Sequence, residues 1–584
     1  MKPKHIKAIL LFTIIIAAAT SCTNLDENVY DKITSETFYQ TKENVYQGFV
    51  RPFEHAYWAC AGASFQVAEN SSDHFMTPNR QGHWLDGQNY FRLHWHQWTI
   101  DDWIPRDAWL NNFQGIVYCN SAIGDLSSLT PSQFEMTDAE MQNLVGNLRT
   151  LRAWFYIRLL DMFRNVPISD KFPSDDLLPK QATPQETFNF IEKELTELIP
   201  ILNAKQGAAG NGPKQGLWTK AGAAALLVRL YLNAELWIGQ NRYADCASIA
   251  QKIIDGEYGS YGIAARWDAP FDWNNENCEE LIYAFTSSFG YSHHVYGNDM
   301  FWWGAPFKAA PYFGFTDWGD MNPRFALQPG LDLNGAEYNF ANGKPVRKFM
   351  KYPDDVRLNK YRNLGNSSRS GMFLYGALDY QASDGTTQYS RADNGKYMLY
   401  LRDQVGWYED TDTASISPKP SGGAPVMISD MDHADQSSGW CMIKYPIYRS
   451  DDAGKMEADY ALIRLPEIYY SLAECKFRQG DKAAAARLLN QVRSRYYPEG
   501  SPSLYKEDGS QITEQELLDE WGREFLGEGL RRTVLCRFGV YTGPWWDKQQ
   551  EPDKHTMILP FHRNILSANP NLVQNPGYPD GREN

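Results

Sequence analysis

The sequence predicts a mainly α-helical protein in which tetratricopeptide-like helical hairpins form a scaffold that carries a large, loop-rich lobe. Two observations support this fold class. Apolar residues recur at spacings of three and four in long segments before residue 256 and after residue 455, as amphipathic helices require. Between these positions the periodicity is lost, and Gly, Asp, Asn, Trp and Tyr become frequent.

The amino-acid composition excludes some classes of function and favours others. The chain has 584 residues, of which 43% are hydrophobic and 22% charged, a balance typical of globular proteins. Its formal net charge of −15 argues against nucleic-acid binding, which needs a positive surface. Aromatic residues make up 14% of the chain, and 19 of them are Trp, more than a core requires. This composition favours a surface on which sugars or other flat ligands stack.

The first 22 residues have the layout of a secretion signal that ends in a lipidation site. Three lysines precede an apolar run at 8–19, which is too short to span a bilayer, and small residues then lead to Cys22. We expect a signal peptide at 1–21, lipid attachment to Cys22 and a tether at 22–42, with plain secretion as the alternative. No later stretch reaches 18 apolar residues, so the lipid is the one membrane anchor expected.

An N-terminal helical scaffold is expected at 43–255. Its longest helix is predicted from Asp138 to Phe163, where large apolar residues recur along one face. Another helix is predicted after Thr183, because an N-cap, a first-turn Pro and an acidic first turn follow one another there. The stretch from Lys220 to Trp237 is rich in Ala and Leu and is also predicted to be helical.

A repeat connects two distant parts of the chain. The helix pair predicted at 221–254 overlays the pair predicted at 460–495, so that Ala234 matches Ala473 and Ala250 matches Leu489. Small residues let two helices approach closely, and large ones fill the remaining space. This is the logic of tetratricopeptide-like hairpins, which stack to bury a shared core. Chance helical periodicity is the alternative.

The most specific motifs lie in the C-terminal third. The sequence DYALIRLPEIY occupies 459–469, REF occupies 523–525, and the chain closes with NPNL at 569–572 and QNPGY at 574–578. Together with the lipidation motif and GLWTK at 216–220, these motifs resemble the SusD/RagB family of glycan-binding outer-membrane lipoproteins.

The resemblance implies a SusD-like helical body of four tetratricopeptide-like units, a variable lobe at 256–455 that carries the ligand site, and C-terminal hairpins at 456–584. It also implies a partner, a TonB-dependent, SusC-like outer-membrane barrel. The pair would capture oligosaccharide or polysaccharide at the outer face of the cell and import it. No catalysis is implied.

Charged residues of the C-terminal motifs are expected to be structural. Their spacings allow ion pairs between residues four apart on a helix, so we expect them to hold helices together rather than bind a ligand. These residues are Arg523, Glu524, Glu528, Arg531 and Arg532.

A glycan site needs flat aromatic faces and planar hydrogen-bonding groups, and residues 73–103 supply both. Two glycines bracket Trp84, which predicts a loop that displays this ring. The family that the chain resembles often places ligand contacts in this region, so the resemblance implies Trp84 as the first candidate, with Asp73, Arg80 and Asp86 as polar partners. For the other tryptophans of this stretch, such as Trp98, core packing is the alternative.

A second aromatic cluster contains Trp302, Trp303 and Trp318, among Gly and Pro. Trp302 and Trp303 would point to opposite faces of an extended backbone, so at most one is expected to line a pocket. Arg369 and Tyr397, from the variable lobe, are candidates to complete such a site.

A metal or cofactor is not expected. His83, His94 and His96 could suggest a metal, but neither HExxH nor CxxC accompanies them, so hydrogen-bonded or exposed histidines are the better interpretation. Acidic stretches at 409–412 and 451–457 could hold a structural calcium ion, but they lack the EF-hand spacing.

Two other classes of function stay open. A glycoside hydrolase needs two carboxylates beside the sugar, and Asp73 with Asp86 would be the first pair to test. No GxSxG, Walker A or HExxH motif supports catalysis, so the protein is not expected to be an enzyme. The other alternative is a helical-repeat scaffold that binds only protein.

Overall fold

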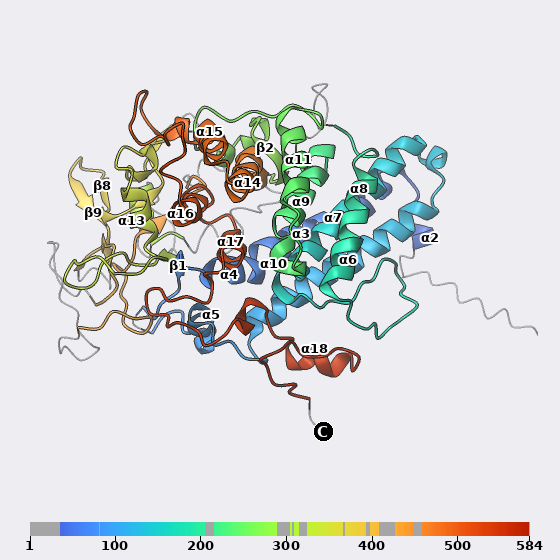
Figure 1. Ribbon diagram of the computed structural model, residues 1–584, viewed down its shortest axis with the longest axis horizontal. Helices are drawn as coiled ribbons and strands as arrows, with labels where there is room; N and C mark the ends of the chain where they lie inside the picture. The colour runs from blue at the N-terminus through green and yellow to red at the C-terminus, as the bar shows by residue number, and fades with distance from the viewer. Residues whose placement is uncertain are drawn as a thin grey trace, which may run out of the picture.

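The computed structural model describes residues 35–80, 82–204, 215–288, 304–306, 309–314, 324–365, 368–392, 397–407, 427–447 and 458–582. Helices dominate this part of the chain, while the strands are short and pair two by two. Figure 1 shows the helical body on the right and in the centre, and the lobe with strands β8 and β9 on the left. The predicted fold class, a helical scaffold with a loop-rich lobe, is confirmed.

The helices of the body come from both ends of the chain. Those of the N-terminal part are α2 (Ser35–Phe38), α3 (Lys42–Ala61), α4 (Ala63–Asn70), α5 (Asn89–Trp95), α6 (Trp103–Ser128), α7 (Asp138–Phe163), α8 (Pro184–Leu198), α9 (Lys220–Leu232), α10 (Ala234–Ile238) and α11 (Tyr243–Ile254). Those of the C-terminal part are α14 (Leu465–Arg478), α15 (Lys482–Arg493), α16 (Glu514–Glu524), α17 (Arg531–Arg537) and α18 (Arg563–Ala568).

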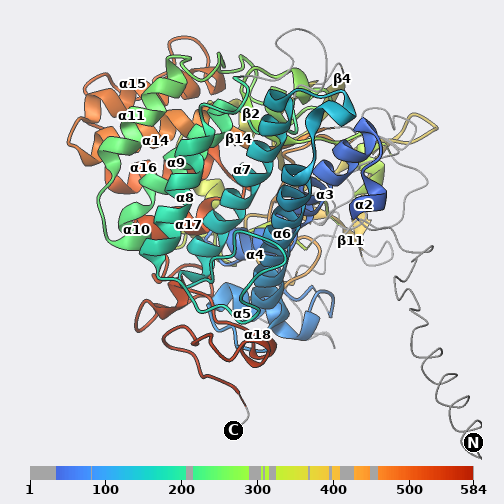
Figure 2. The ribbon, with the colours of Figure 1, turned by 90° about the vertical axis from the view of Figure 1, so that its right-hand side faces the viewer.

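These helices stack as a continuous series. Each contacts the next in the order α3, α6, α7, α8, α9, α11, α14, α15, and Figure 2 shows α6, α7, α8, α9 and α11 side by side. The contact between α6 and α7 is close at Gly115, where a Cβ atom would lie only 2.1 Å from the ring of Phe155. No helix in the described part of the chain combines the length and apolarity that a membrane span requires.

Local sequence explains where the long helices begin. The helix predicted from Asp138 to Phe163 is confirmed as α7, and Thr137 caps it through a reciprocal box with Glu140. Thr183 caps α8 in the same way, with Glu186 as its partner. Each box satisfies backbone N–H groups that a helix start would otherwise leave without an acceptor.

The predicted repeat corresponds to two stacked hairpins. The first is formed by α9 and α11, the second by α14 and α15, and α11 packs against α14. The matched residues Ala234 and Ala473 are both fully buried, as are Ala250 and Leu489. The matched positions are therefore core positions in both helical segments.

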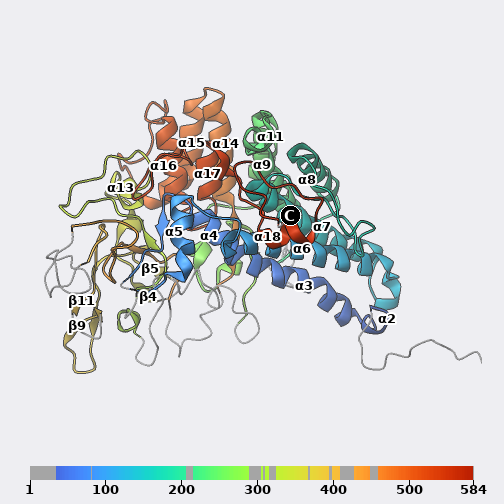
Figure 3. The same ribbon diagram turned by 90° about the horizontal axis from the view of Figure 1, so that it is seen from below.

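The lobe enters and leaves the body at one place. Strand β2 (Leu281–Phe285) pairs antiparallel with β14 (Tyr460–Arg464), the strand directly before α14. Figure 3 shows the lobe extending away from the hairpins. Between β2 and β14 lie the helix α13 (Pro345–Met350) and short strands: β3 (Ala326–Leu327), which pairs with β1 (Phe75–Met76), β4 (Asn363–Gly365), β5 (Ser368–Arg369), β6 (Phe373–Leu374), β7 (Gly376–Ala377), β8 (Asp379–Gln381), β9 (Thr387–Tyr389), β10 (Arg391–Ala392), β11 (Tyr397–Met398), β12 (Tyr400–Leu401) and β13 (Cys441–Met442).

Buried ion pairs connect the C-terminal part of the chain with segments that are distant in sequence. Arg464, which is 1% exposed, lies 2.8 Å from Glu280 and 3.0 Å from Glu524. Arg531 pairs with Asp73, a residue 458 positions away. The expected structural role of the motif charges is confirmed, but the expected spacing of four is wrong, because their partners lie mostly on other elements.

Candidate functional site

The loop that precedes α5 has an unusual backbone. Trp84 has φ = 67°, Asp86 has φ = 38° and Gln88 has φ = 63°. The left-handed region is disfavoured for residues with a Cβ atom, and it is a clear outlier for a bulky ring such as Trp. Such strain is retained where the surrounding structure imposes it, often at binding sites. The loop predicted around Trp84 therefore exists, and its shape is specific.

Arg324 connects Trp84 with Asp86. Its guanidinium carbon lies 4.6 Å from the centroid of the Trp84 ring, and one of its nitrogens lies 3.9 Å from a carboxylate oxygen of Asp86. Arg324 also donates a hydrogen bond of 3.1 Å to the hydroxyl of Tyr90, at the start of α5. Trp84 is half-buried, and its indole N–H has no acceptor among the described residues. The loop's aromatic ring and carboxylate thus meet a cation that comes from a distant part of the chain.

Arg80 lies beneath this loop. It is 1% exposed, and its guanidinium donates to the carbonyl oxygens of Asp435 and Ser438, the second at 3.0 Å. Burial lowers the pKa of Arg80, while nearby groups, including the buried Tyr397, oppose this shift. Both side chains are therefore buried, and the guanidinium of Arg80 is engaged by the protein rather than offered to a ligand.

Asp73 is enclosed by the protein. Its carboxylate accepts hydrogen bonds of 2.7 and 2.9 Å from Arg531 and one of 2.7 Å from the backbone N–H of Gly343. Burial alone would raise the pKa of Asp73, but the charge of Arg531 outweighs it and lowers the pKa below its ordinary value. Asp73 is therefore a structural anion, and it cannot flank a sugar together with Asp86 as a hydrolase would need.

The remaining predicted residues do not join Trp84 in the described structure. Arg369 is buried against the ring of Trp267, with its side chain bonded to the carbonyl of Asp268 at 3.3 Å. Cys22, Trp302, Trp303 and Trp318, as well as the acidic stretches at 409–412 and 451–457, lie outside the described residues.

An aromatic cleft of about 880 Å³ opens at the other end of α5. Trp95, Trp98 and Tyr578 contribute its rings, and the indole of Trp98 donates to the hydroxyl of Tyr578 at 2.8 Å. The exposed carboxamides of Gln97 and Gln549 lie at the same cleft. The combination of rings and planar hydrogen-bonding groups resembles what a sugar requires. Trp98 is buried as the packing alternative expected, yet it also forms part of this wall.

The histidines of this region are bonded within the protein. The ring of His94 lies 2.9 Å from the carbonyl oxygen of Trp546, and the ring of His96 lies between Glu551 and the carbonyl of Ser71. No cluster of three or more metal-binding side chains occurs in the described residues. Both histidines thus have the hydrogen-bonded environment that the sequence favoured over a metal site.

Sequence reasoning missed Arg324. It stands 240 positions after Trp84, in the segment Asn322-Pro323-Arg324, and no local pattern connects the two residues. Only the contact between them in the folded chain identifies it.

Comparison with known proteins places these features in context. A model of the SusD family matches residues 336–578, and a model described as starch-binding and associating with the outer membrane matches residues 25–232. The starch-binding protein SusD of Bacteroides thetaiotaomicron is 26% identical over 99% of this chain and 100% of its own length.

Solved structures share the fold. A laminarin-binding SusD-like protein is 20% identical, with a TM-score of 0.62 over 92% of this chain and 100% of its own. A SusD-like protein from Bacteroides fragilis is 16% identical, with a TM-score of 0.64 over 94% of this chain and 99% of its own. At these identities the likeness describes the fold.

Proposed function

We propose a function from the premise that this chain belongs to the SusD/RagB family, a family of glycan-binding proteins associated with the outer membrane. The protein is a cell-surface lipoprotein, anchored through Cys22, that binds oligosaccharide or polysaccharide. It passes the glycan to a TonB-dependent, SusC-like barrel for nutrient uptake. It binds its glycan without hydrolysing it.

The observation that carries the binding proposal is the geometry of Trp84. The loop holds a large aromatic ring in a strained backbone conformation, with a cation over one face and a carboxylate nearby. Sugars present C–H faces for stacking and hydroxyls for such charged groups. Because Arg324 occupies one face of the ring, the sugar stacks on the other. A single stacking site of this kind is weak, with a dissociation constant of about 10 µM to 1 mM.

Affinity electrophoresis tests this proposal. Residues 23–584 are run through gels that contain one polysaccharide each, beside the variants Trp84→Ala and Trp58→Ala. Trp58 is the matched control, because it is 51% exposed on α3 and stands apart from the loop. We expect one glycan to retard the wild type and Trp58→Ala but not Trp84→Ala. Equal retardation of all three proteins would remove Trp84 from the site.

The same experiment separates the alternatives. Release of shorter sugars during incubation would favour a hydrolase, and the described position of Asp73 argues against that result. Binding to no glycan at all would favour a scaffold that binds only protein. Trp84→Phe distinguishes stacking from the indole N–H, since it keeps an aromatic face and loses the donor.

Anchoring and delivery need their own test. In cells, wild-type protein should partition with outer membranes and co-purify with a large barrel protein. Cys22→Ser should release it into the soluble fraction. If Cys22→Ser stays in the membrane with unchanged mass, lipidation at this residue is excluded.

A further inference from the structure

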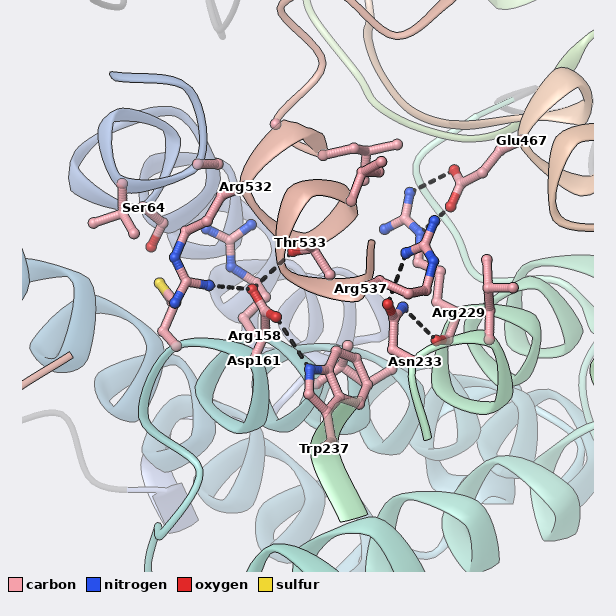
Figure 4. Close-up of a pocket in the computed structure, with 18 of the residues that line it drawn as sticks. Ser64, Arg158, Asp161, Arg229, Asn233, Trp237, Glu467, Arg532, Thr533 and Arg537 are labelled. Carbon is pink, nitrogen blue, oxygen red and sulfur yellow. Dashed lines mark hydrogen bonds and ion pairs between the residues drawn. The ribbon is translucent and has the colours of Figure 1, made fainter. Parts of the chain in front are cut away.

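A pocket in the middle of the helical body brings several arginines together. Its volume is about 110 Å³, and its walls come from α4, α7, α9, α10, α14, α16 and α17. It is separate from the Trp84 loop, which contributes no residue to it. Figure 4 shows two polar groups of residues on its walls: Asp161, Trp237, Arg532 and Thr533 on one side, and Arg229, Asn233, Glu467 and Arg537 on the other.

The acceptors on these walls are already engaged by the protein. Asp161 receives hydrogen bonds from Trp237 at 3.1 Å, from Arg532 at 2.9 Å and from Thr533 at 2.8 Å. Glu467 receives two from Arg229, one of them at 2.7 Å. The carboxylates therefore neutralise these arginines and have little capacity left for a ligand's hydroxyl or ammonium group.

Two donors on the walls are not matched in this way. The indole N–H of Trp521, a residue only 3% exposed, has no acceptor among the described residues. Arg158 donates to the side chain of Asn112 at 2.9 Å, to the carbonyl of Ala59 at 3.0 Å and to the sulfur of Cys60 at 3.7 Å, which leaves two of the five N–H groups of its guanidinium for a ligand. All three partners are neutral, and Arg158 forms no ion pair within the part of the chain that the structure describes. A buried donor without an acceptor costs free energy, and a partly buried cation without an anion costs more.

The ion pairs around the pocket also indicate that it would accept an anion. Arg229 is matched by Glu467, Arg532 by Asp161 and Arg537 by Glu474, while Arg158 retains its positive charge. Its guanidinium lies 4.7 Å from the centroid of the Trp154 ring, which stabilises a cation without neutralising it. Arg537 shares Glu474 with Arg478, so the arginines around the pocket outnumber the carboxylates and the pocket carries a net positive charge.

We propose that this pocket binds a small monovalent oxyanion, such as formate, acetate or nitrate, held by Arg158 and by the indole N–H of Trp521. Arg158 lies on α7 and Trp521 on α16. The anion therefore joins the N-terminal and C-terminal parts of the body. Its binding is independent of the glycan and stabilises the folded protein, because a ligand that binds only the folded state shifts unfolding in its favour.

Thermal unfolding of residues 23–584 tests the proposal. Sodium formate, acetate, nitrate and sulfate are titrated separately, with ionic strength held constant by a bulky organic salt. We expect the melting temperature to rise and saturate with the three monovalent oxyanions, whereas sulfate, which stabilises folded proteins generally because it is excluded from their surface, should raise it without saturation. A rise that is equal for all four salts and does not saturate would indicate a general salt effect and overturn the proposal.

Variants place the effect in the pocket. Arg158→Gln removes the guanidinium and Trp521→Phe removes the indole N–H, while each retains much of the side-chain volume. Each substitution should therefore weaken the apparent affinity for formate at least tenfold. Arg106→Gln, an arginine outside the pocket, is the matched control and should respond as the wild type does. If Arg158→Gln does not fold, the formate response of Trp521→Phe still tests the proposal. An unchanged formate response in Trp521→Phe, or a crystal structure grown in formate with only water in the pocket, would refute the proposal.

Discussion

Glu69 allows a quantitative test of how the body is packed. It lies near the end of α4 and is fully buried, and one carboxyl oxygen accepts a 2.7 Å hydrogen bond from the backbone N–H of Gly529. Its other oxygen has no partner among the described residues. Burial raises the pKa of Glu69 to about 8, although the charges of Lys444 and Arg531 oppose the shift. The carboxyl is therefore protonated in the folded protein at neutral pH.

The sign of the pH dependence follows from this shift. The folded-state pKa is raised from 4.5 to about 8, so the folded protein keeps a proton that the unfolded chain releases in this range. The contribution of Glu69 to stability is fully present below pH 4.5 and is lost as the pH rises through 8. Proton linkage changes the free energy of unfolding by about 1.4 kcal/mol per pH unit between the two pKa values. Over the whole range from pH 4.5 to 8, Glu69 therefore changes the free energy of unfolding by at most about 5 kcal/mol.

Glu69→Gln should remove the part of the pH dependence of stability that Glu69 causes, because the amide keeps an oxygen for Gly529 and cannot ionise. The test is to measure the free energy of unfolding in urea at pH 5 and at pH 8.5. The free energy of unfolding of the variant relative to wild type should rise by several kcal/mol between the two pH values. Glu499→Gln, in an exposed turn, is the control and should show no such change. A difference between Glu69→Gln and wild type that is equal at both pH values would refute the reasoning.

Three further predictions follow from buried contacts. Asp73→Asn leaves the buried guanidinium of Arg531 without its anion and should cost about 3–5 kcal/mol in urea unfolding, whereas a loss below about 1 kcal/mol would contradict a structural role. Gly115→Ala places a Cβ atom against the ring of Phe155 and should cost about 1–3 kcal/mol, which an unchanged melting temperature would disprove. Burial lowers the pKa of His96 to about 4, so stability should fall as the pH drops from 6.5 toward 4, and NMR should find its ring still mainly neutral at pH 5.

The features that could be predicted from sequence are those that neighbouring residues determine. Thr137 and Thr183 define helix starts through residues three positions later, so the ends of these helices are visible in a short window. The loop around Trp84 was predictable for the same reason, since its glycines are local.

The features that could not be predicted depend on contacts between distant segments. The sequence alone left Asp73 as a candidate ligand residue, because its partner Arg531 lies 458 positions away. Arg324 was overlooked because it meets Trp84 only in the folded chain. A charged residue near an aromatic one in sequence is therefore weak evidence of a shared site. Helix periodicity is stronger evidence, because it depends on residues in adjacent turns of the same helix.

The antiparallel pair of β2 and β14 fixes both ends of the lobe at one place on the helical body. Both of its ends are fixed on neighbouring strands, whose Cα atoms lie only about 5 Å apart whatever chain connects them. The entropy of closing a long loop grows slowly, by about 0.6 kcal/mol for each doubling of its length. Changes of length in the parts of this segment that do not contact the helical body therefore cost it little, whereas contacts such as the β1–β3 pair must be kept. The architecture permits ligand preference to diversify while the hairpins beneath it stay unchanged.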